Sequence, residues 1–127
     1  MRYLLDTHFL FWLPIGGSGL SRAARSLINN PENGFLFSTA SIWEIVLKKA
    51  RYRDLAYDPR EVRQMMLENG YTELSVTSEH VLAVDSLASI HRDPFDRLLI
   101  AQAIVEGITL LTADATIARY PGPIRKV

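Results

Sequence analysis

The chain has 127 residues, 48% of them hydrophobic, and its 14 Lys and Arg residues balance its 14 Asp and Glu residues to a formal net charge of zero. This length suits one domain with its own core, so we expect residues 1–127 to form a single domain. The charge balance argues against a protein that grips duplex nucleic acid by charge alone, but it allows a basic surface beside an acidic pocket. The absence of cysteine excludes disulfides and thiolate metal sites, and no apolar run approaches the ~20 residues of a membrane span. We therefore expect a soluble, cytoplasmic protein with no membrane contact.

The first predicted strand, Tyr3-Leu4-Leu5, is apolar and ends at Asp6. Such a run is typical of a central strand of a parallel sheet, buried on both faces, and residues 7–13 have the pattern of the crossover helix that follows. Asp6 would then lie at the carboxyl end of a strand, where open α/β sheets bind ligands. An Asp at this position is also a common N-cap of the next helix, so both interpretations are open here.

A glycine-rich loop, Gly16-Gly17-Ser18-Gly19, comes after this helix. It is not a phosphate-binding loop, because it follows a helix instead of a strand and lacks the Lys-Ser/Thr ending. Beyond the loop, the pattern predicts a helix opened by Ser21, a buried strand over residues 35–38 and then another helix.

Glu44 lies in the helix that follows the second strand, three residues after Ser41. This is the spacing of a capping box, in which Glu44 would reach back to the Ser41 amide. The alternative is that Glu44 lies beside Asp6, at the same edge of the sheet. The helix ends in a basic cluster next to Tyr52, which a solvated helix face and a phosphate-binding surface explain equally well: Lys48, Lys49, Arg51 and Arg53.

The middle of the chain predicts a polar helix over residues 59–69, a short strand over 73–76 and a helix from Thr77 to about residue 90. His80 and His91 do not stand at metal-ligand spacing with another His, so we expect both to be surface or capping residues.

The most informative segment is His91-Arg92-Asp93-Pro94-Phe95-Asp96-Arg97, which leads into a nearly all-apolar helix over residues 98–106. Asp93 fits the N-cap, Pro94 the first helical position and Asp96 the first turn. A buried strand over residues 108–112 comes next, with Asp114 two residues beyond it. Residues 124–127 form a terminal strand.

This alternation of strands and helices predicts a three-layer α/β/α fold with a mostly parallel sheet of four or five strands. Four acids would then gather at one edge of the sheet: Asp6, Glu44, Asp96 and Asp114. Carboxylates about 4 Å apart repel by roughly 1 kcal/mol in water and up to about 4 kcal/mol at an effective dielectric constant of 20. A hard divalent cation turns that repulsion into binding, and no Lys or Arg is adjacent in sequence to Asp6 or Glu44.

Oxygen ligands without His or Cys favour Mg²⁺ or Mn²⁺ over Zn²⁺. An ion held by carboxylates can activate water and stabilise charge in the hydrolysis of a phosphodiester, so the expected substrate is a nucleic acid backbone. Basic residues near the acids are candidates for guiding the strand: Lys48, Lys49, Arg51, Arg92 and Arg97.

Five segments together resemble the PIN-domain ribonucleases, specifically the VapC-type toxins of toxin-antitoxin pairs. They are LLDTHFLFW, LSRAAR, STASIWEIVLKK, HRDPFDRLLIAQA and TLLTAD, which occur in the order of that family and cover nearly the whole chain. The resemblance implies a PIN-like fold and a Mg²⁺-dependent endoribonuclease. It also implies a homodimer that is inhibited by a small cognate antitoxin protein. Two features depart from the family pattern: Arg51 and Arg53 stand where relatives often have a glycine, and the glycine-rich loop is unusual.

Carried over position by position, the resemblance implies metal-binding acids at Asp6, Glu44, Asp96 and Asp114. Asp6 and Asp96 would be the principal ligands. Glu44 would be a ligand or the base that orients water, and Asp114 a supporting acid or a ligand of a second metal. Thr112 would be a polar support, and Asp93 matches a less central family acid for which we keep the N-cap role.

Two other functions remain open from the sequence. A phosphatase or phosphoryl-acceptor domain also has an Asp after its first strand, but it needs a second Asp where this chain has His8. A catalytically silent, partner-binding domain would show no Mg²⁺-dependent change in melting temperature and no RNA cleavage.

Overall fold

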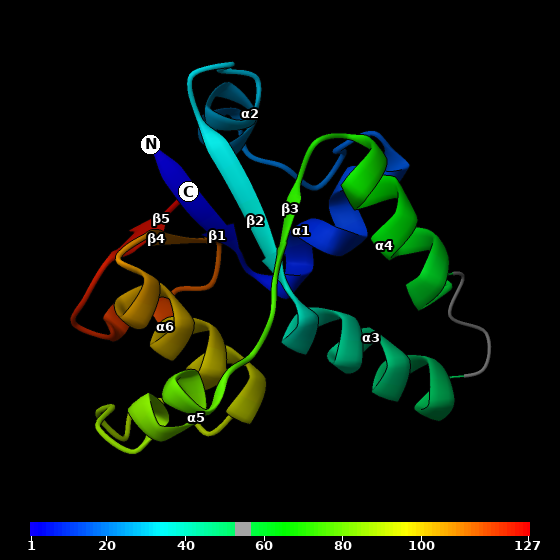
Figure 1. The fold of residues 1–127 in the computed structure, drawn as a ribbon. Helices are drawn as coiled ribbons and strands as arrows, with labels where there is room; N and C mark the ends of the chain where they lie inside the picture. Colours follow the sequence, from blue (N-terminus) through cyan, green and yellow to red (C-terminus); the bar gives the residue numbers. More distant parts are fainter. Residues whose placement is uncertain (53–56) are drawn as a thin grey trace.

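The computed structural model describes residues 1–52 and 57–127, and in these ranges five parallel strands form one sheet (Figure 1). The strand order is β3-β2-β1-β4-β5, from β1 (Arg2–Leu5), β2 (Gly34–Ser38), β3 (Thr72–Leu74), β4 (Thr109–Thr112) and β5 (Ile124–Lys126). The helices are α1 (Thr7–Trp12), α2 (Arg22–Ile28), α3 (Thr39–Arg51), α4 (Pro59–Glu68), α5 (Ser78–Val84) and α6 (Pro94–Glu106). This arrangement confirms the expected three-layer α/β/α class. Across the described ranges, no helix combines the length and the apolarity that crossing a bilayer requires.

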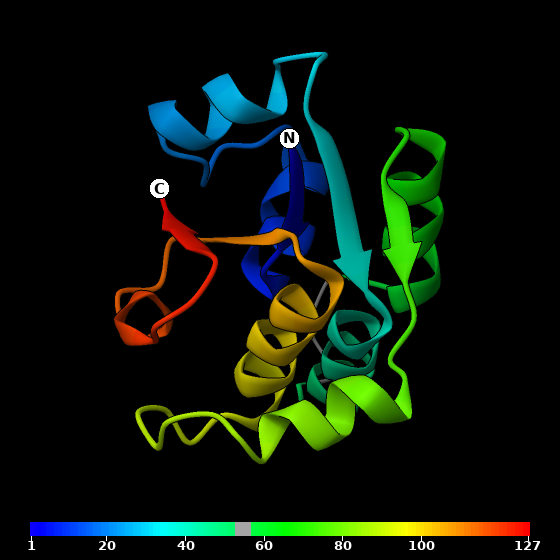
Figure 2. The same cartoon turned by 60° about the vertical axis from the view of Figure 1, so that its left-hand side comes forward.

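The central strand β1 is apolar because each of its faces packs against a different layer of helices. Tyr3 and Leu5 join a core cluster with residues of α1, α2, α3 and α4, whereas Leu4 joins a second cluster with residues of α6. Successive side chains of a strand point to opposite faces, so a strand covered on both sides carries no polar position. Figures 1 and 2 both show α5 beside α6, at the end of the molecule opposite α2.

The order of the strands places a topological switch point beside β1. The chain builds outward from β1 to β2 and β3, then returns to add β4 on the other side of β1. The loops after β1 and β4 therefore leave the sheet from adjacent strands at the same edge. In open α/β sheets, this is where a ligand-binding crevice forms.

The helix after β2 begins earlier than the capping-box interpretation of Ser41 and Glu44 required. Ser38 is the N-cap of α3, since its hydroxyl accepts a hydrogen bond of 3.0 Å from the Ala40 N–H. Ser41 is buried inside the helix, where its Oγ accepts a hydrogen bond of 2.9 Å from the Thr7 hydroxyl. The predicted capping role of Glu44 is therefore wrong.

Helix α5 ends at Val84, short of the expected end near residue 90. The Arg97 guanidinium donates to the backbone oxygens of Val84 at 3.3 Å and Ala88 at 2.9 Å. These carbonyls are satisfied by a side chain of α6, so the segment after Val84 needs no further helical turn.

His80 is not a surface residue, although it has the capping role that was the other expectation. Only 1% of it is exposed, and its Nδ1 accepts a hydrogen bond of 3.0 Å from the Thr77 N–H, which closes a capping box at the start of α5. Its Nε2 lies 2.8 Å from Glu106 Oε2, so the same ring ties α5 to the end of α6.

Replacing His80 should therefore destabilise the fold. We expect His80→Ala to lower the free energy of unfolding by about 2 kcal/mol, because it removes two hydrogen bonds and leaves a cavity. Leu82→Ala on the same helix is the control, since Leu82 is 73% exposed and should change stability little. Chemical denaturation measures both, and equal effects of the two variants would contradict the structural role of His80.

Candidate active site

The candidate site is built around Asp6, where the central strand β1 ends. Asp6 is 1% exposed, and its Oδ1 accepts a hydrogen bond of 2.9 Å from the His8 N–H, which caps α1. Its Oδ2 accepts a hydrogen bond of 2.5 Å from the Thr112 hydroxyl at the end of β4. The cap engages only one of the two carboxylate oxygens, so capping does not exclude a functional role.

Thr112 connects the Asp6 carboxylate to the loop that carries Asp114. Thr112 is fully buried, and its oxygen accepts a hydrogen bond of 3.0 Å from the Asp114 N–H. The Asp114 Oδ1 accepts a hydrogen bond of 2.7 Å from the Thr116 N–H, so this carboxylate also shapes its own loop. A single residue, Thr112, therefore links Asp114 to Asp6 through hydrogen bonds.

Glu44 has one paired and one unpaired carboxylate oxygen. Its Oε2 lies 3.2 Å from Lys48 Nζ, one turn further along α3. Its Oε1 is buried and has no hydrogen-bond partner among the residues that the structure describes. A buried acceptor without a partner costs free energy, so this atom marks a position where a cation or a water would be stabilised.

Asp96 lies in the first turn of α6, in close contact with His91 and near Asp93. The Asp96 Oδ2 is 2.9 Å from His91 Nε2, and these three side chains offer ligand atoms within 4.8 Å of one another. Asp93 also caps α6 as expected, by accepting hydrogen bonds from the Phe95 and Asp96 N–H groups. The pKa of Asp96 is raised to about 6, first by burial and then by the charges of Asp93 and Glu44, while His91 opposes the shift.

His91 was expected at the surface or in a cap, and it is partly exposed but also contacts a site acid. Its side chain is 24% exposed and holds the Asp96 carboxylate, while its backbone N–H donates to the Tyr120 hydroxyl at 2.7 Å. The available signal was the position of His91 just before the N-cap, where the chain can fold back on the first turn of α6.

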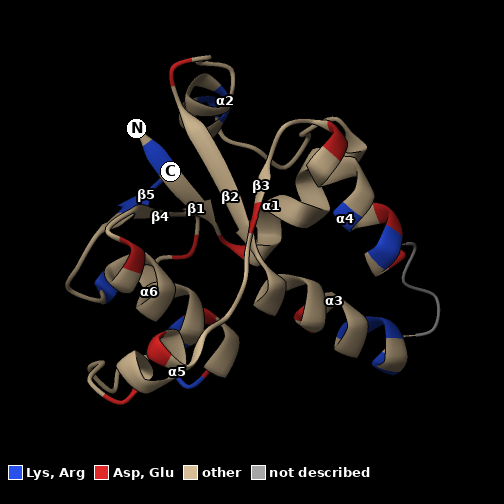
Figure 3. Ribbon diagram, in the orientation of Figure 1, with Lys and Arg blue, Asp and Glu red and all other residues tan. Residues whose placement is uncertain are grey.

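The four expected acids come from four separate segments. The pKa of Asp96 is raised mainly by burial, and the charges of Asp93 and Glu44 add to the shift. The pKa of His8 is raised mainly by its hydrogen bond to Asp6, with a smaller effect from the charge of Asp96, and His8 Nδ1 lies 3.6 Å from Asp6 Oδ1. Asp6, Glu44 and Asp96 therefore share one electrostatic neighbourhood, which Asp114 joins through Thr112. Figure 3 shows acidic segments in red where β1 and β4 end.

The acids nevertheless form two groups. In the described part of the chain, the compact candidate cluster for a metal ion holds His91, Asp93 and Asp96, and it does not include Asp6, Glu44 or Asp114. Taken over both groups, the donors fit a hard divalent cation, because all except His91 are carboxylate oxygens, one of them the unpaired Oε1 of Glu44. The bond from His91 Nε2 to Asp96 is of the kind that orients a metal-binding carboxylate.

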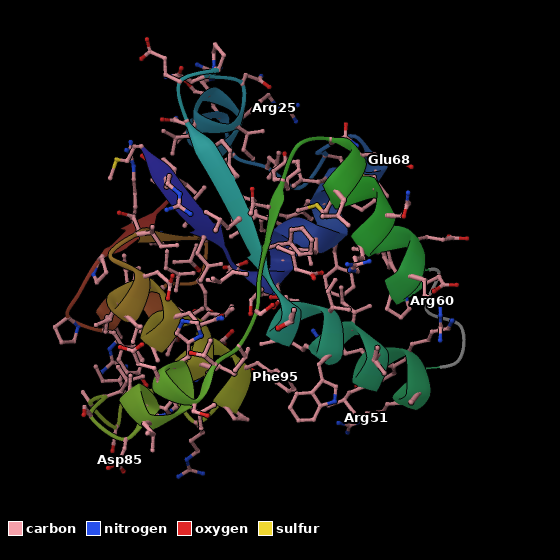
Figure 4. The ribbon with its side chains drawn as sticks, viewed as in Figure 1. Arg25, Arg51, Arg60, Glu68, Asp85 and Phe95 are labelled. Carbon is pink, nitrogen blue, oxygen red and sulfur yellow. The ribbon has the colours of Figure 1, made fainter. Side chains whose placement is uncertain are left out.

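A groove of about 480 Å³ extends from Glu44 and Asp93 between α3 and the start of α6. Cations line it together with aromatic rings: Lys48, Arg51, Arg92, Tyr52 and Phe95. In Figure 4, Arg51 lies at the far end of α3 and Phe95 at the start of α6, the two helices that border the groove. Three of the five residues expected to guide a nucleic acid thus surround one groove beside the acids.

The other basic residues are placed differently. Lys49 does not line this groove and has its Nζ 3.9 Å from Asp58 Oδ2. Arg97 donates to the backbone oxygens of Val84 and Ala88 and to the Tyr120 hydroxyl, so its guanidinium anchors the end of α5 and the segment after it instead of lining the groove. Arg53 lies outside the described residues.

Comparison with known proteins agrees with this architecture. The family model of the PIN domain matches residues 3–123. The chain belongs to the PIN-domain family. A comparison with curated proteins finds no match.

Solved structures with the same fold include three toxin-antitoxin complexes. VapBC2 from Rickettsia felis, bound to a DNA fragment from its promoter, is 16% identical with a TM-score of 0.74, covering 99% of this PIN domain and 98% of that chain. DNA-bound VapBC from Salmonella typhimurium is 14% identical with a TM-score of 0.67, covering 99% and 98%. VapBC-1 from nontypeable Haemophilus influenzae is 15% identical with a TM-score of 0.64, covering 94% and 91%. At such identities the likeness shows the PIN fold alone.

The raised pKa of Asp96 predicts how the stability of this PIN domain depends on pH. The folded protein keeps the Asp96 proton up to about pH 6, whereas an unfolded chain releases it near pH 3.8, so the folded state binds more protons in between. This contribution to stability is present below the unfolded pKa and is lost as the pH rises through about 6.

Asp96→Asn should abolish that loss, because the amide does not ionise. In the presence of a chelator, we expect the melting temperature of Asp96→Asn to rise relative to wild type as the pH increases from 4 to about 6. A difference between the two proteins that stays constant over this range would contradict the raised pKa.

Proposed function

We propose that this PIN domain is a Mg²⁺-dependent endoribonuclease that acts as the toxin of a toxin-antitoxin pair. The observation that carries the proposal is the buried, unpaired Oε1 of Glu44 near Asp96, whose pKa is raised first by burial and then by the charges of Asp93 and Glu44. Such a site accumulates negative charge without enough cations of its own. A divalent ion is the ligand that relieves this repulsion.

In this proposal, Asp6 and Asp96 are the principal ligands of Mg²⁺ or Mn²⁺. When bound, such an ion supplies an activated water and stabilises the charge that develops on a phosphodiester. Thr112 and the His8 N–H hold the Asp6 carboxylate in place, and His91 holds that of Asp96. Asp114 supports the site through Thr112 or binds a second ion.

Glu44 is the residue suited to orient the attacking water. Its Oε2 is held by Lys48, which leaves the unpaired Oε1 to bind the ion or to accept a proton from water. These two roles of Glu44 share the same oxygen.

The groove between α3 and α6 supports RNA as the substrate. Its cations Lys48, Arg51 and Arg92 suit phosphates, and its rings Tyr52 and Phe95 suit unpaired bases. Lys49 is also on α3 but outside the groove, and we propose that it contacts a more distant phosphate. The mixture of cations and rings is typical of surfaces that bind single strands.

The proposed partners follow from the similarity to solved VapBC complexes. By analogy with those complexes, we propose that a small cognate antitoxin neutralises this chain. From the family resemblance of the sequence alone, we propose that the chain forms a homodimer in the cytoplasm. Exposed apolar side chains, including Trp43 at 58% and Leu82 at 73%, offer surface for protein contacts.

Removing one carboxylate of the site tests the proposed chemistry. We expect Asp6→Asn and Asp96→Asn each to lower the rate of Mg²⁺-dependent RNA cleavage by at least about 100-fold, because stabilisation by a bound metal is worth several kcal/mol. Asp85→Asn is the matched control, since Asp85 is exposed at the end of α5. Cleavage that does not depend on Mg²⁺, or that survives both substitutions, would refute the proposal.

Arg51 tests the proposed RNA groove separately from catalysis. We expect Arg51→Ala to weaken binding of single-stranded RNA and to reduce the slope of log K against log salt by about 1, as loss of one phosphate contact does. Arg22→Ala, an exposed position on α2, should leave both unchanged. Fluorescence anisotropy at several salt concentrations measures the slopes, and equal slopes for Arg51→Ala and wild type would exclude the contact.

A further inference from the structure

A second hollow opens beside Asp6, on the side of the glycine-rich loop. It has a volume of about 200 Å³ and is lined by His8, Trp12, Ala113 and Asp114. The His8 side chain is 55% exposed, and its Nδ1 lies 3.6 Å from Asp6 Oδ1. The hollow is therefore accessible to solvent and directly adjoins the candidate active site. The metal chemistry proposed above uses the backbone N–H of His8 but neither its side chain nor that of Trp12.

Two stacked rings on α1 form part of the wall of this hollow. The rings of His8 and Trp12 are stacked, with centroids 5.7 Å apart and planes inclined by 24°. Phe9 supports Trp12 from within the core in an edge-to-face contact at 5.4 Å. The outer ring of the stack is thus exposed, while the inner ring is held by the core.

The glycine-rich loop positions Trp12. A Cβ on Gly19 would lie 2.3 Å from Trp12 Cδ1, so only glycine lets the backbone approach the indole this closely. The Gly17 N–H donates to the Trp12 backbone oxygen at 2.8 Å, and Arg25 fastens the loop by donating to the Gly17 oxygen at 2.7 Å. Gly17 has a φ of 79°, in the left-handed region that favours glycine. The loop, which fits no phosphate-binding motif, therefore holds the Trp12 ring in position.

We propose that the hollow lined by His8 and Trp12 is a nucleobase-binding subsite, in which one base of a single-stranded RNA stacks on the exposed His8 ring. This inference rests on the proposed ribonuclease function. Any of the four nucleobases can stack on a His or Trp side chain, because every base has a π-face. The subsite and the basic groove have different linings: His8 and Asp114 line the subsite, whereas Glu44 and Asp93 border the groove. The subsite would hold one further base, in addition to the phosphates and bases that the groove would bind.

The test compares two ligands on the full chain made inactive by Asp96→Asn. One is a short single-stranded oligoribonucleotide, and the other is an oligomer of equal length and charge that lacks its bases. We expect His8→Ala to weaken binding of the base-bearing oligomer by roughly 5- to 100-fold and to leave binding of the abasic oligomer unchanged. His8→Phe keeps a ring for stacking and should retain the affinity. Fluorescence anisotropy of end-labelled oligomers reads out all of these affinities.

Equal weakening for both oligomers would show that His8 acts through charge and would overturn the subsite, as would no weakening at all. Gly19→Ala provides an independent variant, because it displaces Trp12 without touching His8, and it should also weaken only the base-bearing oligomer. Its control is Gly34→Ala, where the added Cβ would meet Arg2 Cγ at an ordinary 3.6 Å. Equal effects of the two glycine substitutions would contradict the role of Trp12.

Failure of the subsite can be told apart from failure of the ribonuclease. If His8→Ala weakens binding of the base-bearing oligomer only, but wild type does not cleave RNA, the subsite is supported and the proposed activity is refuted. If wild type cleaves RNA in a way that depends on Asp6 and Asp96, but His8→Ala affects both oligomers equally, only the subsite is refuted. If neither oligomer binds, both proposals fail.

Discussion

A carboxylate buried at the carboxyl end of the central strand is the constraint on which the rest of this structure depends. Asp6 is 1% exposed, and burying an ionised group is costly unless hydrogen bonds or a cation compensate. The Thr112 hydroxyl and the His8 N–H supply the hydrogen bonds. Thr112 reaches Asp6 only because β4 pairs directly with β1, so the strand order itself supports the buried charge.

The remaining charges can be understood from this starting point. The chain is neutral overall, yet its acids converge where β1 and β4 end, and the adjoining groove is lined by cations of α3 and by Arg92, just before α6. Lys48 is the one cation that pairs with a site acid in the described residues besides the histidines, and it engages only one oxygen of Glu44. In the proposed function, the acidic pocket would bind a metal ion and the basic groove a polyanion. The same total charge distributed evenly would favour neither ligand.

Much of the fold could be predicted from the sequence because its signals are local. The apolar strand before Asp6, the N-cap Ser21, and the Asp93-Pro94 start of α6 each depend on a few neighbouring residues, and all three are found as predicted. The role of Glu44 was harder to predict, because the same sequence fits both a capping box and the interior of a helix. The choice depends on where β2 ends, which the sequence does not mark.

The candidate site was less predictable, because long-range contacts decide it. His91 reaches Asp96 with its backbone held by Tyr120, 29 residues further on, and no spacing rule reveals that contact. Arg97 has the residue type of a substrate contact, but its three acceptors lie at the end of α5, at Ala88 and on Tyr120. In both cases the residue type was informative, whereas its partner became known only from the tertiary structure.

The central claim is that Asp6, Glu44 and Asp96 hold a divalent cation between them. The most direct test is a crystal structure of the wild-type chain with Mn²⁺, in which the anomalous signal locates the ion. We predict a peak within coordination distance of carboxylate oxygens of Asp6 and Asp96, with Glu44 bound to the ion directly or through a water. A peak held only by His91, Asp93 and Asp96, or no peak at saturating Mn²⁺, would contradict the account.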